Sequence, residues 1–562
     1  MALVATAVYL LTLDRSVSWW DCGEFIATSH GLFVGHPPGA PFYQLLAHCF
    51  TLLSFGHPLW VAPLSNALSA LCAGLTVMLL FRSALLLLFR AGFPQPAAFL
   101  GSAVGALCYL FCDTAWFSAV ESEVYAMAML FCSLDVWLIL RWEQRGDNRL
   151  LLLLALSMGL GVCVHLMTLL VAPMLLWVFV RNAKAFFASR PAVVAVLGCL
   201  LFLAGLTPYA IVPLRAATHP PINEGDPSTA ERFARYLRRE QYEKAPLYPR
   251  QWRQRDAANW EAWGGGDPAS LWSNAKYAFV YQFGYMYCRY LMYNYIGREN
   301  LSSRGIRYPL FVLPFLLGLA GLAVHCRRRR GDFAALLLLF LFGGVVLNLY
   351  LNHPCYEPRE RDYAYVLSFY AFAFWISFGA AAVAERWRRR WIAPLLLVAP
   401  LLMAVGNWPD HDRSRCHSVH DLSMAHLSSC DPGAILFTYG DNDTFPLWYL
   451  RYVEGQRPDV DIHNINLTGY AEVMRLIVDN RFRRPVYFSQ YAYDRLSPFF
   501  PGRLRCEGLC WRLLPSACGV DAPEPLRRHV QYDIQWHITP TEYLDPVSRS
   551  LMRVWQTNTQ DL

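Results

Sequence analysis

Asp21 and Glu24 are two carboxylates whose spacing could do chemistry. They lie in the stretch SWWDCGEFIATSHGLFVGHPPGAP, residues 18–41, which follows the first apolar segment and therefore lies at a membrane face. Residues three apart share one face of a helix. Two neighbouring carboxylates suit a general base with a partner that orients the acceptor or tunes the pKa of the base. The alternative is a helix cap, in which Asp21 caps the helix and Glu24 completes a capping-box-like turn.

Four further polar residues lie beside apolar segments, at positions that the topology described below places on the same membrane face. They are His36, Glu121 and Glu123 in the stretch AVESEVYAM, and His165. We expect these residues to bind the sugar of a donor or an acceptor, with only one of the two glutamates facing inward. For His165 the alternative is a histidine satisfied within an apolar core, although a helix break at that point would favour a polar cavity.

Arg359 and Arg361 form a second cluster, in the stretch EPRERDY. Two arginines separated by one residue are suited to gripping a phosphate. A salt-bridged loop is the alternative. A phosphate clamp that faces a carboxylate base fits the transfer of a sugar from a lipid-linked phosphate to an acceptor hydroxyl, with inversion at the sugar carbon. The base would remove the acceptor proton, and cations would stabilise the charge of the leaving phosphate.

The composition indicates what must position these residues. The chain has 562 residues, of which 55% are hydrophobic and only 16% are charged, whereas about one quarter of the residues of a soluble domain are charged. Residues 61–214 and 308–407 are almost continuously apolar. The sequence therefore predicts a polytopic α-helical membrane protein with two water-exposed parts. The formal charge of +7 comes mostly from arginines between apolar segments, which argues against nucleic acid as a partner.

Eleven candidate spans account for the apolar segments. They lie near residues 1–13, 61–89, 97–117, 122–140, 150–165, 166–181, 192–214, 308–325, 333–351, 365–384 and 392–407. The first is short, and the pair within 150–181 is expected to meet near His165. With the N-terminus inside, the short inner loops carry 16 basic residues and the short outer loops carry 3. The positive-inside rule then places all the candidate site residues and the C-terminus on the outer, extracytoplasmic face of the membrane.

These spans divide the chain into four expected parts. The first is a transmembrane module, 1–214, whose first outer loop is 14–60. An aromatic-rich loop, 215–307, would cap the outer helix ends, and further transmembrane helices would occupy 308–407. Residues 408–562 are expected to form a small outer α/β domain, because apolar strand-like runs at 434–439, 460–465 and 485–490 alternate with helical patterns at 444–454 and 472–480.

Two features of this last part could bind a metal or form a disulfide. The run GDND, residues 440–443, resembles a metal-binding or nucleotide-sugar pattern, but we favour an acidic turn that caps the following helix. Cys506, Cys510 and Cys518 could pair if that side of the membrane is oxidising. No histidine lies at zinc-ligand spacing from them. We therefore predict no metal site.

The stretch SWWDCGEFIATSHGLFVGHPPGAPFYQLL closely resembles the signature of a family of bacterial membrane proteins related to the animal transmembrane protein O-mannosyltransferase. Other stretches resemble the same family from residue 18 to about residue 460, among them AVESEVYAM, GVCVHLMTLL, LNHPCYEPRERDYAY and GDNDTFPLWYLRYVEGQRPDV. The resemblance implies a GT-C glycosyltransferase, a multispan enzyme that takes sugar from a polyprenyl-phosphate donor and carries an acidic motif in its first outer loop. Asp21 and Glu24 lie where that motif falls.

The resemblance implies O-mannosylation, or a related O-glycosylation, of Ser/Thr on exported proteins, with Asp21 as the base. The expected partners are polyprenyl-phosphate mannose, an exported acceptor protein and membrane lipids, and no cofactor is expected. The animal relative has a helical-repeat tail, whereas this chain ends in the α/β segment, so the choice of acceptor stays open.

Three rival functions differ from this expectation. A GT-C enzyme that modifies a lipid or a polysaccharide shares every membrane feature and differs only in its acceptor. A transporter or flippase of a lipid-linked sugar predicts charges near mid-membrane and an inverted hydropathy repeat, and the sequence shows neither. A non-catalytic scaffold or receptor predicts that replacement of Asp21 changes no product.

Overall fold

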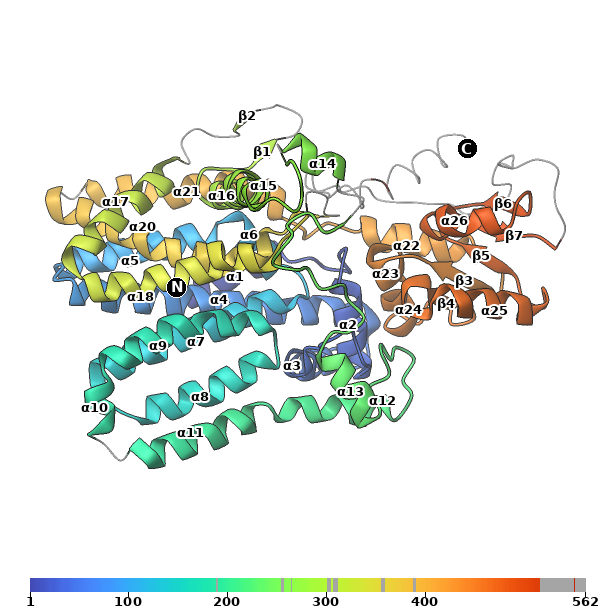
Figure 1. The fold of residues 1–562 in the computed structure, drawn as a ribbon, viewed down its shortest axis with the longest axis horizontal. Helices are drawn as coiled ribbons and strands as arrows, with labels where there is room; N and C mark the ends of the chain where they lie inside the picture. Colours follow the sequence, from blue (N-terminus) through green and yellow to red (C-terminus); the bar gives the residue numbers. More distant parts are fainter. Residues whose placement is uncertain are drawn as a thin grey trace.

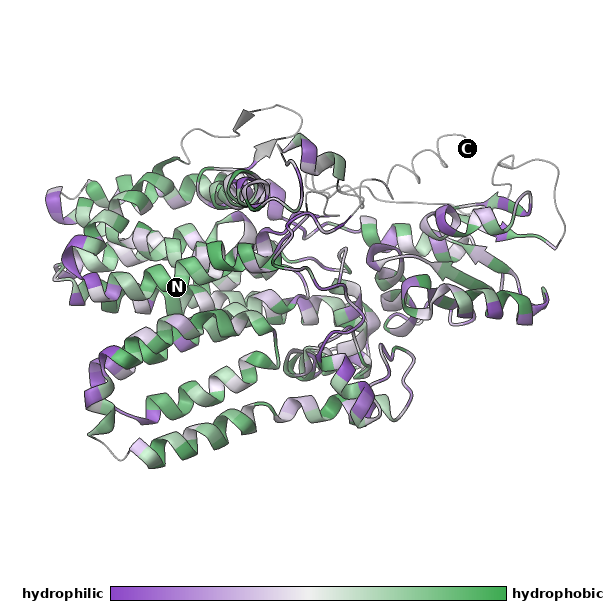
Figure 2. Cartoon of the chain, in the orientation of Figure 1, coloured by the Kyte–Doolittle hydropathy of each residue, from purple (hydrophilic) through white to green (hydrophobic). Residues whose placement is uncertain are grey.

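The structure is a computed structural model and has two parts, a body of long helices and a smaller α/β region beside one end of it (Figure 1). It describes residues 1–188, 191–253, 257–263, 265–300, 305–306, 312–354, 359–387, 391–515 and 550. The long helices are apolar along most of their length, and polar residues gather at their ends and in the loops that face the α/β region (Figure 2). This pattern is typical of a membrane body with a water-exposed domain.

The helical body is built around α20, which is buried along most of its length. It packs against α5 and α17, while α4 packs against α1, α5 and α7. The helices of the body are α1 (Ala2–Leu11), α4 (Pro58–Arg90), α5 (Gln95–Leu110), α6 (Asp113–Ala119), α7 (Val124–Arg145), α8 (Arg149–Val162), α9 (Ala172–Arg181), α10 (Ala183–Phe187), α11 (Pro191–Gly205), α17 (Val312–Arg328), α18 (Arg330–Leu341), α19 (Leu347–Leu351), α20 (Val366–Trp387) and α21 (Ile392–His411).

Several short 3₁₀- or π-helical turns extend these helices: η1 (Leu166–Val171), η2 (Thr207–Ala210), η6 (Phe342–Val346) and η7 (Asp362–Tyr365). As expected, two short helices meet near His165, because α8 ends at Val162 and η1 begins at Leu166. Among the described residues, six helices are long and apolar enough to cross a membrane, or seven if the bent pair α5 and α6 is one span. The protein is therefore a multi-pass membrane protein, and the count of eleven spans stays a prediction.

Shorter helices collect at the end of the body that faces the α/β region. They are α2 (Cys22–Gly31), α3 (Pro41–Leu52), α12 (Ile211–Ala216), α13 (Ala230–Leu237), α14 (Ala257–Ala262), α15 (Leu271–Tyr277), the π-helical η4 (Ala278–Tyr287) and α16 (Cys288–Tyr295), with the short paired strands β1 (Glu299–Asn300) and β2 (Gly305–Ile306). Trp260, Tyr277 and Tyr281 form a small aromatic cluster within the aromatic-rich segment.

The α/β region contains a five-stranded sheet with the strand order β4-β3-β5-β7-β6. The strands are β3 (Ile435–Thr438), β4 (Asp461–Asn464), β5 (Val486–Phe488), β6 (Leu504–Glu507) and β7 (Cys510–Leu513), and the helices are α22 (Ser418–Ser428), α23 (Asp441–Tyr452), α24 (Ile465–Thr468), α25 (Tyr470–Asn480), α26 (Gln490–Leu496) and η8 (Ser497–Phe499). β3 runs parallel to β4 and β5. The expected small α/β unit is thus confirmed, with an antiparallel hairpin added at one edge.

Two of the three cysteines for which a disulfide was considered are described by the structure. Cys506 and Cys510 lie on β6 and β7 and are both free thiols. The Cys510 thiol donates to the carbonyl of His426 instead. Cys518 lies outside the described residues.

The α/β region and the body share an apolar core. Cys22 and Ile26 of α2 lie in the same buried cluster as Phe445 and Trp448 of α23 and Leu436 of β3. Burial of this shared surface fixes α23 against α2. The candidate base is therefore at a junction between the two parts of the molecule.

Candidate active site

Glu24 is fully buried in α2 and is bonded to His36 through both of its oxygens. Its Oε1 accepts from the backbone N–H of His36 at 2.6 Å, and its Oε2 lies 2.6 Å from His36 Nδ1. A Cβ on Gly35 would lie 2.5 Å from Glu24 Oε1, so only glycine allows this close approach. Burial alone lowers the pKa of His36, but the ion pair with Glu24 outweighs it, and the pKa lies well above its usual value. The contact with Glu24 therefore favours the protonated form of His36.

Asp21 does not cap the helix, which disagrees with the capping alternative. It occupies the N-cap position of α2, but its side chain makes no capping hydrogen bond, and Glu24 turns toward His36 rather than back to the helix start. The Asp21 side chain is 22% exposed, and its Oδ2 lies 3.8 Å from Nη2 of Arg359. A carboxylate that is reachable by solvent and free of structural bonds has the properties of a general base.

The residue before Asp21 has an unusual backbone conformation. Trp20 has a φ of +61°, in the left-handed region that bulky residues rarely adopt. Its backbone N–H donates to Oδ1 of Asn442 at 2.5 Å, which fixes this conformation from the α/β region. Backbone strain of this kind is concentrated at functional sites.

Arg359 is held over two aromatic rings beside Asp21. Its guanidinium lies 4.7 Å from the ring centre of Trp20 and 4.5 Å from that of Tyr363. Its Nε is buried without a hydrogen-bond partner among the described residues. A rigidly held guanidinium with an unused donor is well suited to an anionic ligand.

Glu123 faces the same group of charges. It is buried at the start of α7, and its Oε2 has no hydrogen-bond partner among the described residues. Burial and then the negative charge of Asp21 raise the pKa of Glu123 well above its usual value, against the opposing effect of Arg359. Burial therefore favours the neutral form of this carboxyl group, which can donate a hydrogen bond.

The sequence analysis missed Glu224, which comes from the aromatic-rich segment. The backbone of residues 222–224 pairs with Val34, next to His36, through hydrogen bonds of 3.0 and 3.1 Å. Tyr236 donates to the carbonyl of Gly35 at 2.7 Å and holds the same turn. Burial and then the charge of Glu24 raise the pKa of buried Glu224 well above its usual value. The signal in the sequence that could have identified Glu224 is the stretch PPINEGDP, in which an acidic residue lies between two prolines and a Gly-Asp-Pro turn.

Asp441 of the GDND run also belongs to this group, although the sequence favoured a purely structural turn there. The predicted helix cap is wrong, because the N-cap residue of α23 is Gly440 and no side chain caps the helix. Asp443 instead fixes the preceding turn, since its Oδ2 accepts from the backbone N–H of Tyr439 at 2.9 Å and from the Ser489 hydroxyl. Asp441 keeps a solvent-accessible side chain at the start of α23. The surrounding protein and then the charge of Asp21 raise its pKa to about 7.

Three of the expected site residues have other contacts. Glu121 forms a buried ion pair with Arg413, whose Nη1 also lies 3.3 Å from the Ser18 hydroxyl. His165 accepts from the backbone N–H of Met167 at 3.1 Å and packs against Tyr125, as a satisfied histidine at a helix break would. The guanidinium of Arg361 donates to the Tyr363 hydroxyl.

The arginine segment combines a clamp with a salt-bridged loop. Arg359 lies beside Asp21, whereas Glu360 bonds Arg289 and Tyr290 at 2.8 and 2.6 Å. Asp362 accepts from the Thr114 hydroxyl at 2.6 Å. These bonds anchor the segment, and Arg359 is the arginine that they direct to the site. Glu357 lies outside the described residues.

Asp21, Glu24 and His36 are also close enough to be considered as ligands of one cation. One atom of each lies within 4.8 Å of the others. The contacts between Glu24 and His36 already engage two of the three side chains. The expectation that no metal is needed stays a prediction.

Comparisons with known proteins match the two segments that meet at this site. Residues 21–186 match the N-terminal domain of the protein O-mannosyl-transferase TMEM260 family, and residues 419–471 match TMEM260-associated domain 2. The chain is 25% identical over 487 residues to the protein O-mannosyl-transferase TMEM260 of Mus musculus, which covers 83% of this chain and 62% of the relative. It is 23% identical over 542 residues to the protein of the same name from Dictyostelium discoideum, with 88% and 60% covered. The chain thus spans about three fifths of the length of these relatives.

Two solved structures are similar in fold at low identity. ArnT from Cupriavidus metallidurans, bound to undecaprenyl phosphate, aligns with a TM-score of 0.43 and 14% identity over 93% of this chain and 98% of that one. The archaeal oligosaccharyltransferase AglB from Archaeoglobus fulgidus, in complex with an inhibitory peptide and a dolichol-phosphate, aligns with a TM-score of 0.45 and 12% identity over 87% and 69%. The two segments that match TMEM260 family models are thus the ones that carry the candidate site, since the first begins at Asp21 and the second contains Asp441.

Proposed function

We propose that this chain is a GT-C protein O-mannosyltransferase that moves mannose from a polyprenyl-phosphate donor to Ser/Thr hydroxyls of exported proteins. The names of the matched relatives support the reaction, and the residues gathered around Asp21 support the chemistry. The observation that carries the proposal is the Asp21 carboxylate, whose Oδ2 lies 3.8 Å from Nη2 of Arg359. In the part of the chain that the structure describes, the buried Nε of Arg359 has no hydrogen-bond partner.

In the proposed reaction Asp21 takes the proton of the acceptor hydroxyl. The acceptor oxygen attacks C1 of the mannose from the face opposite the phosphate, so that a new C1–O bond forms as the C1–O bond to the phosphate breaks. The electron pair of the broken bond stays on the lipid phosphate, which leaves as an anion. Arg359 stabilises that charge, and the configuration at C1 is inverted.

The other charged groups would have distinct roles. Glu24 orients His36, and the imidazolium of His36 would donate a hydrogen bond to a sugar or phosphate oxygen. The neutral carboxyl groups of Glu123 and Glu224 can both donate and accept, which suits the hydroxyls of a sugar. Glu121, through Arg413, would hold the first outer loop rather than touch the sugar.

In the membrane we propose eleven spans, with the site and the C-terminus on the outer face of a plasma membrane. Four shorter apolar helices, Ala2–Leu11, Arg149–Val162, Leu166–Arg181 and Val312–Arg328, would complete the spans beyond the seven that length alone identifies. The asymmetry of basic residues between the short loops supports this orientation. We propose that the reaction needs no metal.

The test is sugar transfer in purified membranes with polyprenyl-phosphate mannose and a Ser/Thr-rich peptide. Asp21→Asn keeps the size of the side chain and removes the base, and we expect kcat to fall about 10²-fold or more. Asp412→Asn is the matched control, because Asp412 is exposed and bonds only its neighbour Ser414 among the described residues. Equal transfer by the Asp21 variant and the wild type would refute the base assignment. No transfer by the wild type, with transfer to a lipid acceptor instead, would refute the protein acceptor.

A further inference from the structure

A cavity of about 810 Å³ opens between α4, α5 and α7 at the end of the body where the chain begins. Its walls are mostly apolar and include Phe81, Leu85, Phe89 and Phe99, together with the guanidinium groups of three arginines. α7 starts beside the candidate active site at Glu123 and reaches this cavity at Arg141, which is about 27 Å further along the helix. The cavity is therefore separate from the site of sugar transfer.

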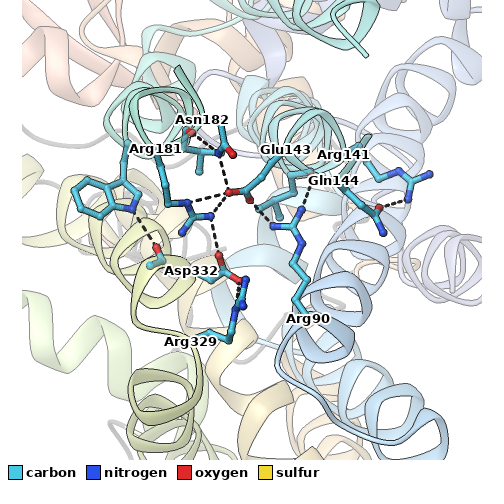
Figure 3. Close-up of polar contacts among 12 residues, drawn as sticks. Arg90, Arg141, Glu143, Gln144, Arg181, Asn182, Arg329 and Asp332 are labelled. Atoms are coloured by element: carbon cyan, nitrogen blue, oxygen red, sulfur yellow. Dashed lines mark hydrogen bonds and ion pairs between the residues drawn. The ribbon is translucent and has the colours of Figure 1, made fainter. Parts of the chain in front are cut away.

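The carboxylates at this end are already paired with other arginines. Glu143 bonds Arg90 and Arg181 and accepts from Asn182 at 2.9 Å, while Asp332 bonds Arg181 at 2.8 Å (Figure 3). This network ties α4, α7, α9 and α18 together at one membrane face. Among the residues of this network, no carboxylate remains to pair with Arg82 or Arg141, the other two arginines of the cavity.

Arg82 and Arg141 form no ion pair within the part of the chain that the structure describes. Their guanidinium carbons lie 6.0 and 5.9 Å from the ring centre of Trp137, which both side chains share. Arg141 donates to Oε1 of Gln144 at 2.6 Å (Figure 3). Two positive charges that share one aromatic ring repel one another unless an anion joins them.

We propose that this cavity binds an anionic phospholipid of the surrounding membrane. The phosphate would lie between Arg82 and Arg141, and an acyl chain would lie along Phe89 and Phe99, which are 48% and 56% exposed. Basic pockets between membrane helices bind acidic head groups in this way. The apolar walls favour a lipid over a free anion, because a free phosphate gains nothing from contact with aromatic rings.

The test compares the full-length protein in nanodiscs of phosphatidylglycerol and of phosphatidylcholine. The double variant Arg82→Gln/Arg141→Gln removes the cluster, and Arg149→Gln is the matched control, since Arg149 is exposed at the same end of the body and lies outside the cavity. Native mass spectrometry counts the phospholipids that stay bound after extraction, and a thermal scan measures their effect on Tm. Phosphatidylglycerol is expected to bind the double variant about 30-fold more weakly, at about 1 kcal/mol for each arginine.

The proposal is supported if phosphatidylglycerol, but not phosphatidylcholine, stays bound to the wild type and to Arg149→Gln and raises their Tm, while the double variant loses both effects. It is overturned if the double variant retains as much phosphatidylglycerol as the wild type. It is also overturned if phosphatidylcholine binds equally, or if inorganic phosphate alone reproduces the rise in Tm. For each variant, the Tm in phosphatidylcholine is subtracted from the Tm in phosphatidylglycerol. This difference removes any general loss of stability that the double substitution causes.

Discussion

Gly23 lies where α2 touches the α/β region, between the two carboxylates of the candidate site. A Cβ on Gly23 would lie 2.6 Å from the carbonyl oxygen of Phe445, 2.7 Å from its carbon and 3.0 Å from the nitrogen of Pro446. These are backbone atoms of α23, so no side chain can rotate away to make room. To reach an ordinary contact of 3.4 Å, the two helices must separate by about 0.8 Å in Gly23→Ala.

That separation is expected to reduce both stability and activity. Overpacking of a well-packed contact costs about 1–3 kcal/mol in the free energy of unfolding. Asp21 and Glu24 flank Gly23 on the same turn, and a misplacement approaching 1 Å lowers a rate by up to about 10²-fold. We therefore expect kcat for mannose transfer to fall by about 10- to 100-fold in Gly23→Ala, at a temperature where the variant remains folded.

The assay is transfer to the Ser/Thr-rich peptide, with Tm measured on the same preparation. Gly198→Ala is the matched control, because the nearest atom to a Cβ there is 3.9 Å away and the substitution favours the helix by up to about 1 kcal/mol. Its activity should equal that of the wild type. A wild-type kcat in folded Gly23→Ala would refute the conclusion that the docking of α23 on α2 positions the base.

Two further predictions concern charges at the site. Arg359→Gln should lower kcat about 10²- to 10³-fold, since it removes the cation nearest the proposed leaving phosphate. Arg359→Lys should restore part of the rate. An unchanged kcat in Arg359→Gln would contradict the proposal that Arg359 binds the phosphate. Asp441 has a pKa of about 7, raised from 3.8, so its contribution to stability is complete at low pH and is lost as the pH rises through 7. Asp441→Asn should therefore flatten the fall in Tm between about pH 4 and pH 7, whereas Asp459→Asn, at an exposed carboxylate paired with Arg457, should leave that slope unchanged.

The sequence predicted much of the fold because the signals involved are local. The apolar runs gave the long helices, and alternating apolar and helical segments gave β3, α23, β4, α25 and β5 in the right order. Apolar runs and turn residues determine the structure of residues close to them in the sequence, so the elements can be predicted from the sequence alone. The break near His165 was predictable for the same reason, because a run too long for one span and too short for two full ones must bend.

The candidate site was only partly predictable, because charge partners lie far apart in the chain. Glu121 and Glu123 are two residues apart, but one pairs with Arg413 and the other faces Asp21. Arg359 and Arg361 likewise differ, because Arg359 lies beside Asp21 whereas Arg361 donates to the Tyr363 hydroxyl. No local pattern distinguishes the members of either pair, since the choice depends on which distant residue packs against each one.

The sequence by itself determined that this is a multi-pass membrane protein with a small α/β region, and that Asp21 and Glu24 follow its first apolar helix. Only the tertiary structure decided that Glu224 and Asp441 join them. Glu224 comes to the site because residues 222–224 pair with Val34, and Asp441 comes because α23 shares an apolar core with α2. Burial of apolar surface brings such segments together, and it depends on the shape of the whole fold rather than on any stretch of sequence.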